Sequence, residues 1–168
     1  MRDVVLHWGE MGQAWGVNRS VGQIHALLFM VAKPLTAEDI AETLGLARSN
    51  VSNSLKELLD WDLIVRRHEM GDRRDFFVAK GDMWDIVMTI VEGRKKREID
   101  PTIAMLARAA AEAKDDRTTP PEVKKRIQEM HKFVVNLTGW YDQVKTLPIA
   151  TLMKLMNLGA KIAKFVAG

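Results

Sequence analysis

One short segment of the chain carries side chains that can hydrogen-bond the edges of nucleic-acid bases. A helix is predicted to begin near Arg48, and about 180° from its apolar stripe the side chains are short and polar. Asparagine can form a bidentate pair with adenine, and serine can donate or accept at several base edges, so this face suits the floor of a major groove. The residues expected to face bases are Ser49, Asn50, Ser52 and Asn53. Any solvated helix can carry similar side chains. For this helix alone, a base-reading face and an ordinary solvent-exposed face are therefore equally favoured.

Four cations accompany this face. Arg48 begins the helix and Lys56 lies further along it, and both can contact phosphates. Arg73 and Arg74 lie at or next to the tip of a predicted hairpin, where they can reach phosphates or the minor groove beside the helix. Asp72 can equally pair with one of them and give it a structural role, and for Arg74 both alternatives are left open.

The elements that must position these side chains are a helix-turn-helix and a hairpin. Thr36 supplies a side-chain oxygen for an N-cap, and Asp39 follows three residues later to make a near capping box. Gly45 tolerates a left-handed C-cap best, so the first helix should end there. β-branched and aromatic runs on either side of the turn signal Gly71-Asp72 predict two strands. The strands are expected over residues 63–68 and 76–78.

Helices are also predicted on the N-terminal side of this unit. An apolar seam at helical spacing runs along the first residues and needs a partner, either other helices or a second chain. Its members are Val4, Trp8, Met11 and Trp15. Ser20 is the expected N-cap of the next helix, and Pro34 stops that helix.

Further helices are predicted after the hairpin. Asp82 caps the first of them, and Pro101 either kinks this helix or begins a new one. Residues 119–122 read as another capping box, so a helix should run from there to about residue 145. The last helix, opened by Pro148, is amphipathic and carries lysines. Such a helix can lie on a membrane, but packing in a dimer explains its apolar face more simply.

The sequence gives no support for catalysis. The four histidines occur singly in different predicted elements, without the spacing of metal ligands. They are His7, His25, His68 and His131. No glycine-rich loop joins a strand to a helix, which removes the usual signal for a nucleotide phosphate. We therefore expect no enzyme, no cofactor and no metal site.

The run Leu44–Leu55 followed by Gly71–Phe77 resembles the MarR-type winged-helix regulators. The aromatic pair that ends this run, with residues 82–85 after it, is most similar to the GbsR-like branch, named for regulators of glycine betaine synthesis. The resemblance is strong over roughly residues 35–85 and implies a winged helix-turn-helix that binds DNA. One departure is Ala47, which stands where the family usually has Ser or Thr as the cap of the recognition helix. Loss of such a cap costs about 1 kcal/mol, so the first residue of this helix is left open.

The same resemblance implies that some members sense choline-like osmoprotectants. Aromatic side chains can hold a quaternary ammonium group by cation–π attraction. The residues considered for an effector pocket are Trp8, Trp15, Trp84, Trp140 and Tyr141. Tryptophans at helical spacing more often belong to a core, and Trp61 is expected to anchor the recognition helix to the wing.

Composition bounds the class of protein. With 168 residues, of which 47% are hydrophobic, the chain can build a core. It has no cysteine, which excludes a disulfide scaffold and fits a cytoplasmic protein. No membrane-spanning stretch or signal-like segment is found in the sequence, so a soluble, unprocessed chain is expected. Residues 1–80 hold ten Lys/Arg against eleven Asp/Glu, a net charge of −1, so binding to DNA depends on where the cations point.

Together these patterns predict a mainly α fold: a winged helix-turn-helix with a small β-hairpin, flanked by dimerisation helices. The expected domains are an N-terminal dimerisation helix over 1–18, the winged helix-turn-helix over 19–81, and a C-terminal helical dimerisation region over 82–168. The predicted function is sequence-specific binding of double-stranded DNA by a homodimeric repressor, with a small-molecule effector. The alternative is a winged-helix module that docks a protein or RNA and makes no operator contacts.

Overall fold

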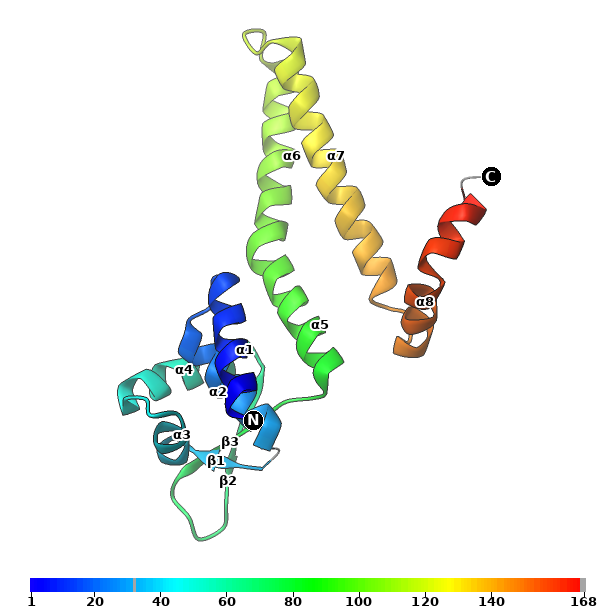
Figure 1. The fold of residues 1–168 in the computed structure, drawn as a ribbon. Coiled ribbons are helices and arrows are strands. Elements are labelled where there is room, and N and C mark those ends of the chain that lie inside the picture. Colours follow the sequence, from blue (N-terminus) through cyan, green and yellow to red (C-terminus); the bar gives the residue numbers. More distant parts are fainter. Residues whose placement is uncertain (32, 167–168) are drawn as a thin grey trace. The chain divides into compact units, whose positions relative to one another are not determined.

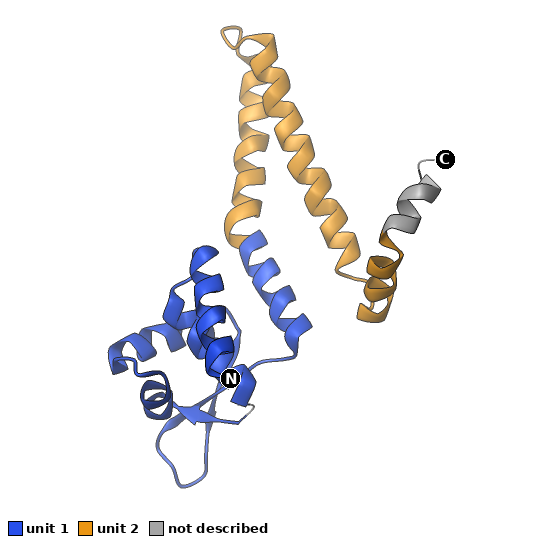
Figure 2. Cartoon of the chain, viewed as in Figure 1, with its two compact units in different colours: residues 1–95 blue, residues 96–168 orange. Residues whose placement is uncertain are grey.

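The computed structural model describes the backbone of residues 1–31 and 33–166, and side chains as far as residue 159. The chain divides into two compact units, residues 1–95 and 96–168 (Figure 2). The predicted mainly α fold with a β wing is confirmed. The polar helix and the wing both lie in the first unit, and the role of each segment in dimerisation stays a prediction.

The first unit holds five helices and three strands among its described residues (Figure 1). The helices are α1 (Arg2–Ala14), α2 (Arg19–Val31), α3 (Ala37–Leu44), α4 (Arg48–Asp60) and α5 (Met83–Arg94). The strands are β1 (Leu35–Thr36), β2 (Ile64–His68) and β3 (Asp75–Ala79). They form an antiparallel sheet in the order β1-β3-β2, so the hairpin strand β3 is central.

Local signals set the ends of α3. The Thr36 hydroxyl accepts from the Asp39 amide, and the Asp39 carboxylate accepts from the Thr36 amide at 2.9 Å, which completes the predicted capping box. The Thr36 hydroxyl, which donates to this carboxylate at 2.7 Å, and the Thr36 amide together lower the pKa of the Asp39 carboxyl. Gly45 ends the helix at φ 65°, in the left-handed region that disfavours a Cβ.

The core of this unit forms where α2, α3, α4 and the sheet meet. Residues 20–28 of α2 are all buried, including Ile24, Leu27 and Leu28. From α4 come Val51, Leu55 and Leu58, all at most 3% exposed. Burial of each such side chain contributes about 1.5–3 kcal/mol, which holds α4 in place although its N-terminus has no side-chain cap.

Helix α1 packs on α2 through small residues. A Cβ on Gly22 would lie 3.1 Å from the Cα of Gly9, so the two backbones approach as closely as glycines allow. The buried positions of α1 are Val5 and Gly9, whereas Val4 and Trp15 of the predicted seam remain 46% and 60% exposed. Trp8 of the seam packs against the core, so the seam is covered only in part within this unit.

Two predicted caps are wrong. Asn18, not Ser20, caps α2, since its Oδ1 accepts from the Ser20 amide at 3.0 Å. Before α7 the cap position is taken by Pro120, which has no side-chain hydrogen bond, and the Thr119 hydroxyl donates instead to Asp116. An Asp earlier in the loop competes for the threonine, so the four-residue capping pattern does not form.

The second unit consists of helices. After α5 a π-helical turn, Lys95–Ile99, leads without a non-helical residue into α6 (Asp100–Asp115), where Pro101 lies in the first turn. The antiparallel partner of α6 is α7 (Pro121–Val144), followed by α8 (Ile149–Val166). Within the described residues, no helix combines the length and apolar character that crossing a membrane requires.

Candidate nucleic-acid interface

The solvent side of α4 matches the face predicted from the sequence in all but one position. Burial of its apolar stripe turns the opposite side of the helix outward. The exposed residues are Arg48, Ser49, Ser52, Asn53 and Lys56. Their side chains can donate and accept hydrogen bonds, and no carboxylate lies among them until Asp60 at the end of the helix.

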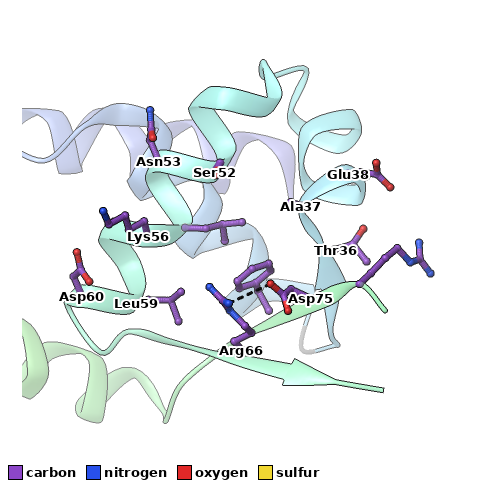
Figure 3. A pocket seen from close by; sticks show the side chains of 13 residues that line it. Thr36, Ala37, Glu38, Ser52, Asn53, Lys56, Leu59, Asp60, Arg66 and Asp75 are labelled. Carbon is purple, nitrogen blue, oxygen red and sulfur yellow. Dashed lines mark ion pairs between the residues drawn. The ribbon is translucent and has the colours of Figure 1, made fainter. Parts of the chain in front are cut away.

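A groove of about 650 Å³ separates α4 from the sheet. Figure 3 shows Ser52, Asn53 and Lys56 on the helix side and Arg66 with Asp75 on the strand side. Thr36 and Glu38, at the start of α3, line it as well. Recognition helix and wing thus border one continuous surface.

Arg74 is held in a fixed position in the wing. Its Nε lies 3.0 and 3.1 Å from the two carboxylate oxygens of Asp72, and its Nη2 lies 2.6 Å from Oδ2. Its guanidinium also lies 5.5 Å from the ring centre of Phe76. These hydrogen bonds lower the pKa of Asp72 to about 2 and raise that of Arg74, so the pair stays ionised at neutral pH. The pairing left open from the sequence therefore forms.

Arg73 differs from its neighbour. Its side chain is exposed, and no ion-pair partner is found for it among the residues that the structure describes. It is thus available to a phosphate without first leaving a carboxylate.

Other cations beside the groove are paired with acids. Arg48 lies 3.0 Å from Glu38, and Arg66 lies 3.3 Å from Asp75. Both pairs are solvent-exposed, and such pairs contribute little to folding stability. Sequence reasoning left Arg66 out of the site, although the basic end of its strand was a visible signal.

Asn50 points differently from the other polar residues of α4. Its Oδ1 accepts from the Ser20 hydroxyl of α2 at 2.7 Å, and its side chain is half-buried. The structure thus brings Ser49, Ser52 and Asn53 together on the open face, and places Asn50 at the contact between α4 and α2.

Residues 15–75, which contain α2, the helix-turn-helix and most of the wing, match the family model described as MarR family. The winged helix-turn-helix of this chain is thus of the MarR type. YvaV of Bacillus subtilis strain 168, named as an HTH-type transcriptional regulator, is 23% identical over 80% of this chain and 77% of its own length. The HTH-type transcriptional repressor GbsR of the same organism is 22% identical over 87% of this chain and 83% of its own. The resemblance inferred from the sequence is confirmed.

A solved transcriptional regulator shares the fold of this chain. Its TM-score is 0.60 at 20% sequence identity, over 84% of this chain and 97% of that one. Since MarR-family proteins are transcriptional regulators, the expectation that the chain is not an enzyme is confirmed. Within the described part of the chain, no group of His, Cys, Asp or Glu could hold a metal ion.

A second groove of the MarR-family head is apolar. It measures about 170 Å³ and is lined by α1, α2, α5 and the end of α4. Trp8, Trp15 and Trp61 line it, together with His25 and Glu57. Trp84 is not among its lining residues, and Trp140 and Tyr141 belong to the other unit. The structure therefore groups two of the five predicted effector residues with a third tryptophan.

Trp61 has a different neighbour from the expected one. A Cβ on Gly93 of α5 would lie 2.7 Å from its ring, so the indole rests on the backbone of α5. It packs the end of α4 against α5, and its role toward the wing stays a prediction.

Proposed function

We propose that this chain binds double-stranded DNA in a sequence-specific way. In this proposal α4 enters the major groove, with Ser49, Ser52 and Asn53 toward base edges. Arg48, Lys56, Arg73 and Arg74 contact phosphates or the minor groove. The observation that carries the proposal is the exposed polar face of α4 bordering the same groove as the wing. A regulator of this kind acts where the chromosome is, in the cytoplasm.

We further propose a homodimeric repressor. An exposed apolar stripe runs along α7 with spacings of three, four and three residues, which is the pattern of a helix that pairs with another. It consists of Met130, Phe133, Leu137 and Trp140, exposed by 57%, 67%, 52% and 61%. A second copy of the chain is the simplest cover for it. Repression follows the function named for GbsR.

Selection from a pool of random double-stranded DNA tests both statements. A two-fold dimer should recover a palindromic site whose half-sites lie about one helical turn apart. Sedimentation at micromolar concentration should give twice the 19.0 kDa mass of one chain. A pool that stays random, or a monomer, would contradict the proposal. The near-neutral head and its paired cations would then favour a module that docks RNA or another protein.

The apolar groove is the proposed effector site. Three tryptophans, one carboxylate at Glu57 and a buried imidazole line it, together with Arg94, whose guanidinium donates to the Trp15 carbonyl at 2.7 Å. The aromatic faces with the Glu57 anion suit a quaternary ammonium group. Burial lowers the pKa of His25 to about 4, so this imidazole is neutral at pH 7 and does not repel a cation.

Choline should therefore change tryptophan fluorescence, and the Trp61→Phe variant should respond less than the parent. The second readout is binding to the selected DNA with and without choline. If neither fluorescence nor DNA binding changes up to millimolar choline, the effector proposal is wrong. That result would not contradict the separate proposal that the chain binds DNA.

A further inference from the structure

A cluster of hydroxyl and amide groups joins the first turn of α2 to the recognition helix. We call Asn18, Ser20, Asn50 and Ser54 the α2–α4 polar cluster. The Ser20 hydroxyl lies 2.9 Å from Asn18 Oδ1, 2.7 Å from Asn50 Oδ1 and 3.0 Å from the Ser54 hydroxyl. Ser20 and Ser54 are 4% and 2% exposed, so water does not compete for these bonds.

Each serine hydroxyl can donate only one hydrogen bond, which restricts the order of donors and acceptors in the cluster. Asn18 Oδ1 already accepts from the Ser20 amide at 3.0 Å as the cap of α2. A consistent arrangement is that Ser54 donates to Ser20, and Ser20 donates to Asn50 Oδ1. In this arrangement the chain of donors ends on the amide oxygen of Asn50, which is the nearer of the two amide oxygens beside the Ser20 hydroxyl.

This use of the oxygen limits what Asn50 can do at DNA. A bidentate pair with adenine needs the amide oxygen and the amide nitrogen of the same asparagine. Asn50 has committed its oxygen to Ser20, whereas Asn53 is exposed and has no hydrogen bond from its side chain among the described residues. Asn53 can therefore present both amide atoms to adenine, whereas the Asn50 oxygen would have to accept a second hydrogen bond from a half-buried position at α2.

The cluster also stands where α4 lacks another anchor. Ala47 at its N-cap makes no side-chain hydrogen bond, so the first turn is not held by its own cap. Asn50, in that first turn, ties it instead to α2. Side chains that read bases need such support from neighbouring groups to keep their positions within a fraction of an ångström.

We propose that Asn50 and Ser20 are positioning residues for DNA recognition and that Asn53, not Asn50, reads a base. The proposal rests on the proposed DNA-binding function. It places a determinant of specificity at Ser20, on α2 and outside the helix-turn-helix. Removal of either partner breaks the hydrogen bond between Asn50 and Ser20 and lets the first turn of α4 shift.

Selection from random double-stranded DNA by the parent, N53A and N50A chains tests this. The N53A chain should lose preference at one base position of each half-site, on the order of tenfold, and keep the others. The N50A chain should keep the preferred base everywhere but discriminate less at all positions. Circular dichroism and thermal unfolding show whether each variant folds.

Variants of the buried serines Ser20 and Ser54 test the same proposal without changing Asn50. Ser20 and Ser54 cannot touch a base, so S20A and S54A should weaken discrimination at all positions as N50A does. In a double-mutant cycle, S20A should cost less in the N50A chain than in the parent. Loss of preference at a single position in N50A, or additive effects in the cycle, would overturn the inference. A parent chain that recovers no motif would instead refute the proposed function.

Discussion

Acidification from neutral pH to about pH 4 is expected to lower the free energy of unfolding by roughly 3 kcal/mol through His25 alone. His25 is 4% exposed, and its Nε2 has no hydrogen-bond partner. Burial lowers its pKa from 6.5 to about 4, because the charged imidazolium would lose its hydration.

The sign follows from proton uptake. Between about pH 6.5 and pH 4 the unfolded chain binds a proton at this histidine and the folded chain does not. The free energy of unfolding therefore rises with pH across this window. The contribution of His25 is fully present above about pH 6.5 and is lost as the pH falls toward the folded-state pKa of about 4. Urea unfolding at a series of pH values, followed by tryptophan fluorescence, measures this loss.

The His25→Gln variant is the control, since glutamine stays neutral and keeps a polar side chain of similar size. The difference in unfolding free energy between parent and variant should change by most of the expected amount between pH 7 and pH 4. His7, which is solvent-exposed, provides a second control, and His7→Gln should follow the parent. Parallel curves for the parent and His25→Gln would show that the imidazole does not resist protonation.

Features encoded by neighbouring residues were predictable from the sequence. The capping box at Thr36 and Asp39, and the left-handed end of α3 at Gly45, depend on residues a few positions apart. The apolar stripe of α4 is equally local, so its outer face could be assigned. The two wing strands were likewise predicted from the β-branched and aromatic runs on either side of the Gly71-Asp72 turn.

Features made by distant residues were not predictable. Strand β1 has two residues, Leu35 and Thr36, and exists because they pair with Phe77 and Phe76 some forty positions later. Asn50 was assigned to the base-facing side because its angle on the helix allows that. Only the packing of α2 against α4 shows that Ser20, thirty residues earlier, holds its oxygen.

Replacement of Arg74 by alanine is expected to weaken binding to the selected DNA by on the order of tenfold to a hundredfold. Asp72 and Phe76 already hold the guanidinium in one position, so little side-chain entropy remains to be lost on binding. Arg73 has no ion-pair partner among the described residues, so the DNA must order it. R73A should therefore cost less affinity, and its main effect should be to reduce the salt slope of binding by about one unit.

The opposite outcome has a clear physical meaning. Asp72 also places a negative charge within hydrogen-bond distance of Arg74, and that charge competes with a phosphate. If neutralisation outweighs positioning, D72N will bind DNA more tightly than the parent and R74A will change little. If positioning dominates, D72N will bind more weakly, because the freed side chain of Arg74 must be ordered again.

The R74K variant separates the effect of charge from the effect of side-chain shape. It should keep the salt slope but not the affinity, since an ammonium cannot make the planar two-point contact. Anisotropy titrations of these four variants at several salt concentrations decide between the two.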